Sequence, residues 1–178
     1  MCREQIFIEN ERLLIHGLRD QDLDGLTAMR NDPRIYRYEP TFLIELQGTP
    51  EEALRAIQGM DLFEDRQCIL GIYEKNDPDA LAGLAEFYDF KPSGKVISIG
   101  CRLRPEYWSM GLGTNCAQLL VDFIKKNTEV ELITAHVITD NKYSPRPLLK
   151  NGFKLLVTKP DDWGHDSKDV AGVYTLEL

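Results

Sequence analysis

The sequence predicts a mixed α/β (α+β) fold with one mostly antiparallel sheet, in a single domain over residues 1–178. A length of 178 residues makes one domain the default. Three strand-like runs in the first half are joined by short turns, which favour antiparallel pairing. The second half alternates strand-like and helix-like segments, a pattern typical of mixed sheets. Together these segments predict about six to seven strands and about four helices.

The N-terminal part predicts one strand and two helices. "RLLIHGL" (residues 12–18) is strand-like, and "RDQDLDGLTAMRND" (19–32) has one apolar helical face that ends before a proline. A stronger helix signal follows in "TPEEALRAI". Thr49 is the expected N-cap, Pro50 takes the first helical position, and Glu52 closes a capping box.

The middle of the chain predicts an antiparallel meander of three strands. The strand-like runs are "RQCILGIYE" (66–74), "ALAGLAEFYDF" (80–90) and "KVISIGCRL" (95–103). The turns "KNDPDA" and "KPSG" separate them, and both are rich in the Asp, Asn, Pro and Gly residues of tight turns.

The C-terminal part predicts a β-α-β-α-β order at the sequence level. An amphipathic helix follows a glycine pair and runs to about residue 126. A strand rich in β-branched residues covers 131–139, and a short helix lies within 141–153. Two further strands, 153–157 and 170–178, enclose an acidic loop, "TKPDDWGHDSK".

Charge and composition limit the classes of partner. The net charge is −8, so the electrostatic field disfavours nucleic acid and anionic membranes and favours cationic partners such as amines. The N-terminal stretch "MCREQIFIENERLL" carries charges where a signal peptide needs apolar residues, which predicts a cytoplasmic protein. Four cysteines without a C-x-x-C pair and three scattered histidines predict no metal site and no disulfide framework.

The glycine pair at Gly111 and Gly113 lies where a helix begins, in "PEYWSMGLGTNCAQLL". A P-loop is excluded because Thr114 and Asn115 follow in place of Lys and Ser/Thr. A dinucleotide fingerprint is excluded because Cys116 occupies the place of its third glycine. Two interpretations stay open: a loop that needs left-handed backbone, or a pyrophosphate loop of the acyl-coenzyme A type.

Two motifs in this order resemble the GCN5-related N-acetyltransferases (GNAT), above all the RimJ/RimL-like branch that acetylates ribosomal-protein N-termini. That branch commonly has Tyr-Trp-Gly-x-Gly-x-Ala/Gly-Thr before its long helix. The matching residues here are Tyr107, Trp108, Gly111, Gly113 and Thr114, whereas Ser109 replaces a glycine. The second motif, Asn-x-x-Ser followed by Leu-x-Lys-x-Gly-Phe, is matched by Asn141, Ser144, Leu148, Lys150, Gly152 and Phe153.

The resemblance implies a sheet that splays at its centre and binds acetyl-coenzyme A (acetyl-CoA) as co-substrate. The strand backbone at about 101–103 would pair with the pantetheine arm, and the glycine loop would hold the diphosphate. Asn141 would bond the pantetheine, and Arg146 or Lys150 would meet the adenosine 3′-phosphate. The implied coenzyme-binding residues are Cys101, Arg102, Leu103, Ser109, Met110, Gly111, Leu112, Gly113, Thr114, Asn141 and Lys150.

The implied reaction is direct attack of a primary amine on acetyl-CoA in a ternary complex. Ser98 stands where the branch often has its glutamate base, so Glu86 is the expected substitute. The alternative interpretation of Glu86 is a solvated strand residue without a catalytic role. Ser144 is the expected acid that protonates the leaving thiolate, although a helix N-cap is an alternative role for it. Tyr143 is the second candidate for the acid. His136 lies in a buried-looking strand and is expected to be a core residue.

The favoured acceptor is a protein N-terminal α-amine, with a polyamine or another small amine as alternatives. An α-amine has a pKa of ~8 and a lysine-type amine ~10.4, so an α-amine depends less on a strong base. The acidic segment "DDWGHD" (161–166) is either a mobile surface loop or an acidic, aromatic rim that would attract cationic acceptors. The missing glutamate also allows a catalytically weak acyl-CoA-binding sensor or assembly module. Relatives of this kind are often homodimers.

Overall fold

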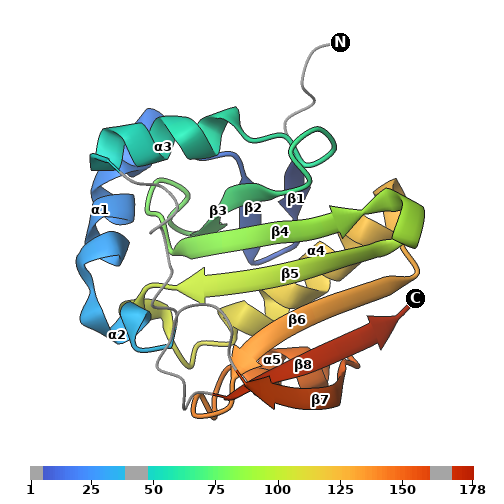
Figure 1. The fold of residues 1–178 in the computed structure, drawn as a ribbon. Coiled ribbons are helices and arrows are strands. Elements are labelled where there is room, and N and C mark those ends of the chain that lie inside the picture. The colour runs from blue at the N-terminus through green and yellow to red at the C-terminus, as the bar shows by residue number, and fades with distance from the viewer. Residues whose placement is uncertain (1–5, 39–47, 161–169) are drawn as a thin grey trace.

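The computed structural model describes residues 6–38, 48–160 and 170–178, and these residues form one sheet with helices on both of its faces (Figure 1). The strand order is β1-β2-β3-β4-β5-β6-β8-β7. The strands are β1 (Phe7–Glu9), β2 (Leu13–His16), β3 (Cys68–Glu74), β4 (Gly83–Lys91), β5 (Val96–Leu103), β6 (Leu132–Ile138), β7 (Lys154–Pro160) and β8 (Val170–Glu177). The helices are α1 (Leu23–Asn31), α2 (Pro33–Tyr36), α3 (Pro50–Gly59), α4 (Leu112–Asn127) and α5 (Pro145–Lys150).

The predicted fold class is confirmed, but the sheet has eight strands in the described chain and the prediction was six to seven. The first strand, β1, was missed because it has only three residues, of which Ile8 alone is buried. The short helix α2 was also missed. The Asp32-Pro33 pair that ends α1 also starts α2, since the Asp32 carboxylate accepts a hydrogen bond from the Arg34 backbone N–H at 2.9 Å.

The predicted capping box of α3 is confirmed. The Thr49 hydroxyl accepts from the Glu52 backbone N–H at 3.3 Å, and the Glu52 carboxylate accepts from the Thr49 N–H at 2.8 Å. This reciprocal pair satisfies donors that a helix N-terminus leaves open. It fixes the start of the helix that covers β3.

The sheet is antiparallel except between β5 and β6, which run parallel. These two strands pair only where Val96–Ser98 meet Leu132–Thr134. Beyond those three residue pairs β5 continues to pair with β4, and β6 continues to pair with β8. The sheet therefore splits between β5 and β6, and the central splay implied by the resemblance is confirmed.

Two apolar clusters hold the layers together. The larger one joins α4 to the sheet through residues such as Leu120, Ile97 and Ile133. The smaller one packs α1 and α3 against the opposite face, through Leu26, Leu54 and Leu84, among others. In Figure 1, α4 lies behind the sheet, and the described residues place no helix in front of β5 and β6. None of the described helices is long and apolar enough to cross a membrane.

Candidate active site

The split between β5 and β6 begins at a buried pair of hydroxyl groups. Ser98, at the last paired position of β5, is only 2% exposed, and its Oγ lies 2.7 Å from Thr134 Oγ1 on β6. A serine in this position ties the two strands together. Ser98 thus provides a buried hydroxyl, and no carboxylate, at the position where the resemblance leads one to expect a glutamate.

The backbone beyond this pair forms one edge of the split. Cys101, Arg102 and Leu103 lie at the far end of β5, paired with β4 on one side only. A strand with a partner on one side directs alternate N–H and C=O groups toward its open side. An extended ligand segment entering the split can therefore pair with this edge as an additional strand would.

The connection from β5 to α4 contains left-handed backbone at two positions. Ser109 has a φ of 61° and Gly111 a φ of 82°. Gly111 is the N-cap residue of α4 and has no side chain with which to cap the helix. The first N–H groups of a helix have no partner within it and carry its positive dipole end, so they can bind an anion. Ser109, Met110 and Gly111 are exposed there, whereas Leu112 turns inward and is fully buried.

Gly113 has a different role from Gly111. A Cβ atom at Gly113 would lie 3.3 Å from Pro147 Cγ on α5, whereas one at Gly111 would meet only Arg12 Nη1, at 3.6 Å. The two helices are joined further by Asn151, whose Nδ2 donates to the carbonyls of Thr114 at 3.0 Å and Pro147 at 2.8 Å. Gly113 thus permits the close approach of α4 and α5.

The start of α5 shows that Ser144 is not a side-chain cap. The Asn141 Oδ1 atom accepts from the backbone N–H of Tyr143 at 3.3 Å and of Ser144 at 3.2 Å. Ser144 does occupy the N-cap position of α5, as the alternative interpretation expected, but its side chain makes no capping hydrogen bond. Tyr143 is 68% exposed, with the Arg146 guanidinium 5.2 Å from its ring centre. Lys150 is exposed at the end of α5.

Glu86 lies on the face of the sheet opposite α4, where it forms an ion pair with Arg102 of β5. The two side chains are only 12% and 19% exposed, so Glu86 is not a solvated strand residue. Gly100 is paired with Glu86, and Glu86 Oε2 lies 3.1 Å from where a Cβ of Gly100 would be. The absence of a side chain at Gly100 therefore leaves room for this carboxylate at the edge of the split.

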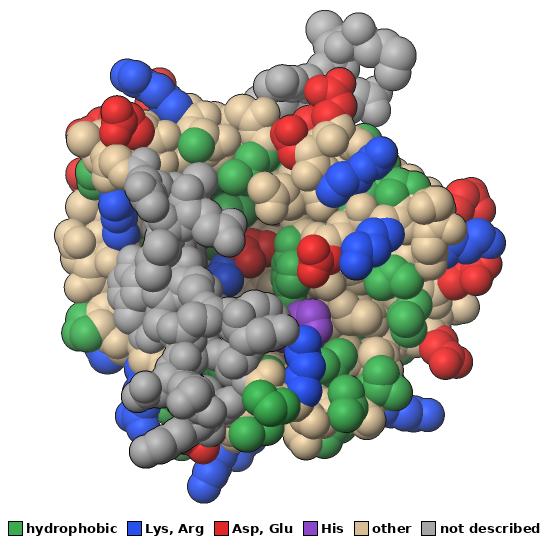
Figure 2. All heavy atoms as spheres, viewed as in Figure 1, with side chains coloured by type: hydrophobic (Ala, Val, Ile, Leu, Met, Phe, Trp, Pro, Cys, Tyr) green, Lys and Arg blue, Asp and Glu red, His purple; other side chains and the backbone are tan. Residues whose placement is uncertain are grey.

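His136 lies on the same face and is not the core residue that the sequence predicted. It is half-buried on β6, two residues beyond Thr134, and its Nδ1 lies 3.3 Å from the hydroxyl oxygen of Tyr88 on β4. In Figure 2, histidine, acidic and basic side chains surround a hollow on this face. The sequence analysis missed Tyr88, although its spacing of two residues from Glu86 places both side chains on one face.

Cys101 of β5 and Cys116 of α4 meet on the face of the sheet that α4 covers. A hydrogen bond with Cys101 and burial raise the pKa of the Cys116 thiol well above its usual value. Cys116 is completely buried, which confirms the sequence interpretation of this residue as part of the core. Cys101 is half-buried on β5, where the implied pantetheine segment begins.

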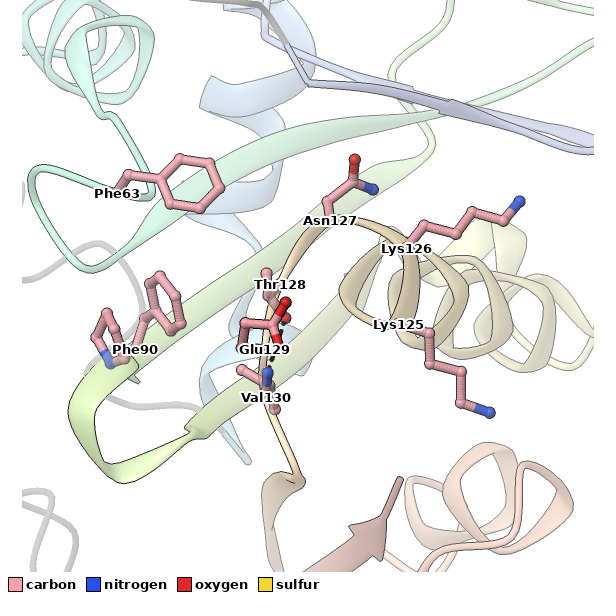
Figure 3. A pocket seen from close by; sticks show the side chains of 9 residues that line it. Phe63, Phe90, Lys125, Lys126, Asn127, Thr128, Glu129 and Val130 are labelled. Carbon is pink, nitrogen blue, oxygen red and sulfur yellow. Dashed lines mark hydrogen bonds between the residues drawn. The ribbon is translucent and has the colours of Figure 1, made fainter.

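A separate cavity of about 460 Å³ lies at the other end of α4 (Figure 3). Phe63 and Phe90 form one side of it, and Thr128 and Val130 form another. It adjoins the C-terminus of α4, which carries the negative end of the helix dipole. Lys125 and Lys126 also line this cavity, but it lies away from the open strand edge of β5, so the split and the N-terminus of α4 are the candidate active site.

The acidic loop expected to form a rim, "DDWGHD" (161–166), lies outside the described residues. The described residues around the split still combine the open edge of β5, the uncapped N-terminus of α4, and a polar cluster on the sheet face opposite α4. This fold and this site define a class of enzyme, the acetyl-CoA-dependent N-acetyltransferases, which are acyltransferases.

Comparisons with known proteins show the family. The family described as an acetyltransferase (GNAT) domain matches residues 12–154, and the chain belongs to that family. An uncharacterized N-acetyltransferase of Bacillus subtilis, YoaA, is 28% identical over 148 residues, which cover 83% of this chain and 82% of YoaA.

Two solved structures share the fold. The ribosomal L7/L12 α-N-protein acetyltransferase RimL in complex with coenzyme A has a TM-score of 0.79 and 18% identity, over 97% of this chain and 98% of that one. A spermidine N-acetyltransferase from Vibrio cholerae, in complex with coenzyme A and spermine, has a TM-score of 0.77 and 15% identity, over 94% of this chain and 96% of that one.

Proposed function

We propose that the protein transfers the acetyl group of acetyl-CoA to a primary amine by direct attack, with the coenzyme in the split between β5 and β6. The observation that carries this proposal is the split itself, which opens after three residue pairs and leaves one edge of β5 unpaired. The uncapped N-terminus of α4 lies near the end of β5, since Leu103 Cδ1 is 4.0 Å from a Cβ built on Gly113.

The coenzyme would contact three segments. The backbone of Cys101–Leu103 would pair with the pantetheine, and one N–H there would polarise the thioester carbonyl. The N–H groups from Ser109 to Thr114 would hold the diphosphate. The side-chain amide nitrogen of Asn141 would bond the pantetheine, because only its oxygen is engaged in the hydrogen bonds of the described residues. Lys150 would meet the adenosine 3′-phosphate.

Ser144 would protonate the departing thiolate, with Tyr143 as the alternative acid. The hydroxyl of Ser144 makes no capping bond, which supports a chemical role for it. On the opposite face, Glu86 would meet the ammonium group of the acceptor through Oε2, since Oε1 is held by Arg102. Glu86 is also one candidate for the group that removes the proton of that ammonium.

The acceptor is proposed to be an α-amine at a protein or peptide N-terminus, as for RimL. The spermidine N-acetyltransferase makes a polyamine the main alternative. A cytoplasmic location is part of the same proposal, because the free thiols of Cys68, Cys101 and Cys116 suit a reducing compartment.

Release of free coenzyme A thiol from acetyl-CoA, measured across N-terminal peptides, polyamines and small amines, tests the proposal. Turnover with at least one amine is the expected result. Calorimetric titration of acetyl-CoA runs in parallel. Tight binding without turnover on any acceptor would instead identify an acyl-CoA-binding module, which the buried Ser98 at the expected glutamate position would then explain.

A further inference from the structure

Two side chains, those of Glu86 and Tyr88, lie next to Gly100 at the mouth of the split, on the face opposite α4. The Glu86 carboxylate and the Tyr88 ring lie 3.1 Å and 3.6 Å from where a Gly100 Cβ would be. His136 approaches from β6, on the other side of the split, and contacts the Tyr88 hydroxyl at 3.3 Å. A thioester carbonyl beside β5 would therefore lie between strands that carry these groups.

Two polar side chains in this region, Ser98 and Glu86, have partners that make them poor acceptors of a proton. The Ser98 hydroxyl is buried against Thr134 Oγ1. The Glu86 carboxylate is paired with Arg102. A carboxylate–guanidinium pair is strong because the carboxylate is charged, so adding a proton to Glu86 would weaken that contact.

We propose that His136 is the catalytic base that removes the proton from the attacking amine, and that Tyr88 is the positioning residue for its imidazole ring. When Nδ1–H donates to the Tyr88 hydroxyl oxygen, Nε2 keeps its lone pair and can accept a proton. A neutral imidazole is a suitable base near pH 7. This inference rests on the proposed acetyl transfer and assigns a step within it.

The protons and bonds of the step balance. His136 Nε2 takes one proton from the ammonium group of the acceptor and becomes an imidazolium. The neutral amine attacks the thioester carbon, so a C–N bond forms and the C–S bond breaks. The second proton leaves the acceptor nitrogen and ends on the coenzyme A thiol, through the acid proposed above. The imidazolium then returns its proton to water.

Among the residues that the structure describes, charged and titratable groups on the same face as His136 come from three neighbouring strands. Glu86 and Tyr88 lie on β4 and Arg102 lies on β5. On β7, Lys159 pairs with Ala171 in the row of Ile138, on the same face of the sheet as His136.

The decisive experiment compares His136→Asn with the unchanged protein on two kinds of acceptor at pH 7. Asparagine keeps a polar group near the Tyr88 hydroxyl but cannot act as the base. For a peptide α-amine, which is mostly protonated at pH 7, kcat/KM is expected to fall about 100-fold. For a fluorinated primary amine that is already neutral at pH 7, the loss is expected to be much smaller. Acetyl-CoA affinity, measured by calorimetry, is expected not to change.

Two further variants test whether His136 or Glu86 is the base. Tyr88→Phe retains the ring and removes the hydroxyl, so it is expected to reproduce part of the loss with the same dependence on acceptor basicity. Glu86→Gln is expected to raise the KM for the acceptor more than it lowers kcat. If only Glu86→Gln shows a loss that disappears with neutral amines, Glu86 is the base and the assignment of His136 is wrong. An equal loss of His136→Asn activity with both kinds of acceptor also overturns it.

Failure of this inference can be told apart from failure of the proposed function. If the unchanged protein transfers acetyl groups and a folded His136→Asn protein does so equally well, only the inference fails. If the unchanged protein transfers to no amine, the proposed function fails and the inference fails with it. Should His136→Asn not fold, Tyr88→Phe provides the same comparison between the two kinds of acceptor.

Discussion

Asn141 and Ser144 are three residues apart at the start of α5, but their side chains have separate tasks. The Asn141 side-chain oxygen accepts hydrogen bonds from two backbone N–H groups, whereas the Ser144 side chain makes no capping hydrogen bond to α5. A residue type that commonly caps helices is therefore available here for chemistry. The sequence pattern could not separate these tasks, because both residue types are frequent caps.

Ser144→Ala is therefore expected to lower kcat without changing the melting temperature. Loss of an acid that protonates the leaving thiolate costs on the order of 100-fold in rate. Steady-state kinetics and a thermal melt of the same preparation provide the two readouts. A lower melting temperature with unchanged kcat would show that Ser144 has a structural function instead.

Asn141 permits a matched pair of substitutions. Asn141→Ala removes the two side-chain hydrogen bonds to the backbone just before α5, and we expect a loss of about 1 kcal/mol in the free energy of unfolding. Asn141→Asp keeps the accepting oxygen but loses the amide nitrogen, so it is expected to retain stability and bind acetyl-CoA more weakly. Denaturant titration and calorimetry test both variants, and equal acetyl-CoA affinity for Asn141→Asp and the unchanged protein would refute the pantetheine contact.

Breaking the Glu86–Arg102 ion pair is expected to lower the free energy of unfolding. Arg102→Met leaves a largely buried carboxylate without its partner, and this is expected to destabilise the protein by about 3 kcal/mol. The double variant Glu86→Gln/Arg102→Met should recover much of that loss, since no unpaired charge remains. Urea unfolding of the four proteins measures the coupling. Additive losses would mean that the pair contributes little.

At the scale of whole elements, the contact between α4 and α5 decides how the glycine loop can be tested. Gly113→Val would meet Pro147 as well as any diphosphate, because Pro147 Cγ lies 3.3 Å from the added Cβ. A weakened affinity for coenzyme A in that single variant would therefore have two explanations. The sequence predicted the loop and the helix, but not that α5 packs so closely against the start of α4.

The variants Gly113→Ala, Pro147→Ala and their combination separate the two explanations. If the glycine serves packing alone, the double variant should recover both the melting temperature and the coenzyme A affinity of the unchanged protein. If the N–H groups of α4 hold the diphosphate, the double variant should recover stability while its coenzyme A affinity stays low. We expect the second result, measured by thermal melts and calorimetry.

At the scale of the whole molecule, the net charge of −8 favours acceptors that arrive as cations. Salt screens such attraction beyond ~10 Å at 0.1 M. The KM for a peptide acceptor is therefore expected to rise with ionic strength. Because an α-amine has a lower pKa than a polyamine and depends less on a strong base, kcat/KM should still be higher for N-terminal peptides than for spermidine. Matched measurements at two salt concentrations test both expectations. A clear preference for polyamines, or a KM indifferent to salt, would contradict them.

The sequence predicted the global arrangement better than the active-site contacts. Strand and helix positions follow from local periodicity and caps, as in the capping box of Thr49 and Glu52. Contacts between distant segments do not. The pairing of Glu86 with Arg102 and of Tyr88 with His136 depends on how β4, β5 and β6 align, which no local pattern specifies. The three-residue strand β1 was missed for lack of any periodic signal.

The split in the sheet also connects the supply of acetyl-CoA with the amount of enzyme. Only three residue pairs join β5 to β6, so a coenzyme lying in the split would add contacts between the two halves that the folded chain alone lacks. A ligand that binds only the folded chain raises the free energy of unfolding, by about 2.7 kcal/mol at one hundred times its dissociation constant. Cellular proteases remove the unfolded fraction, so a stability change of this size alters abundance several-fold. A cell that runs short of acetyl-CoA would then hold fewer copies of the enzyme that consumes it, with no change in its synthesis.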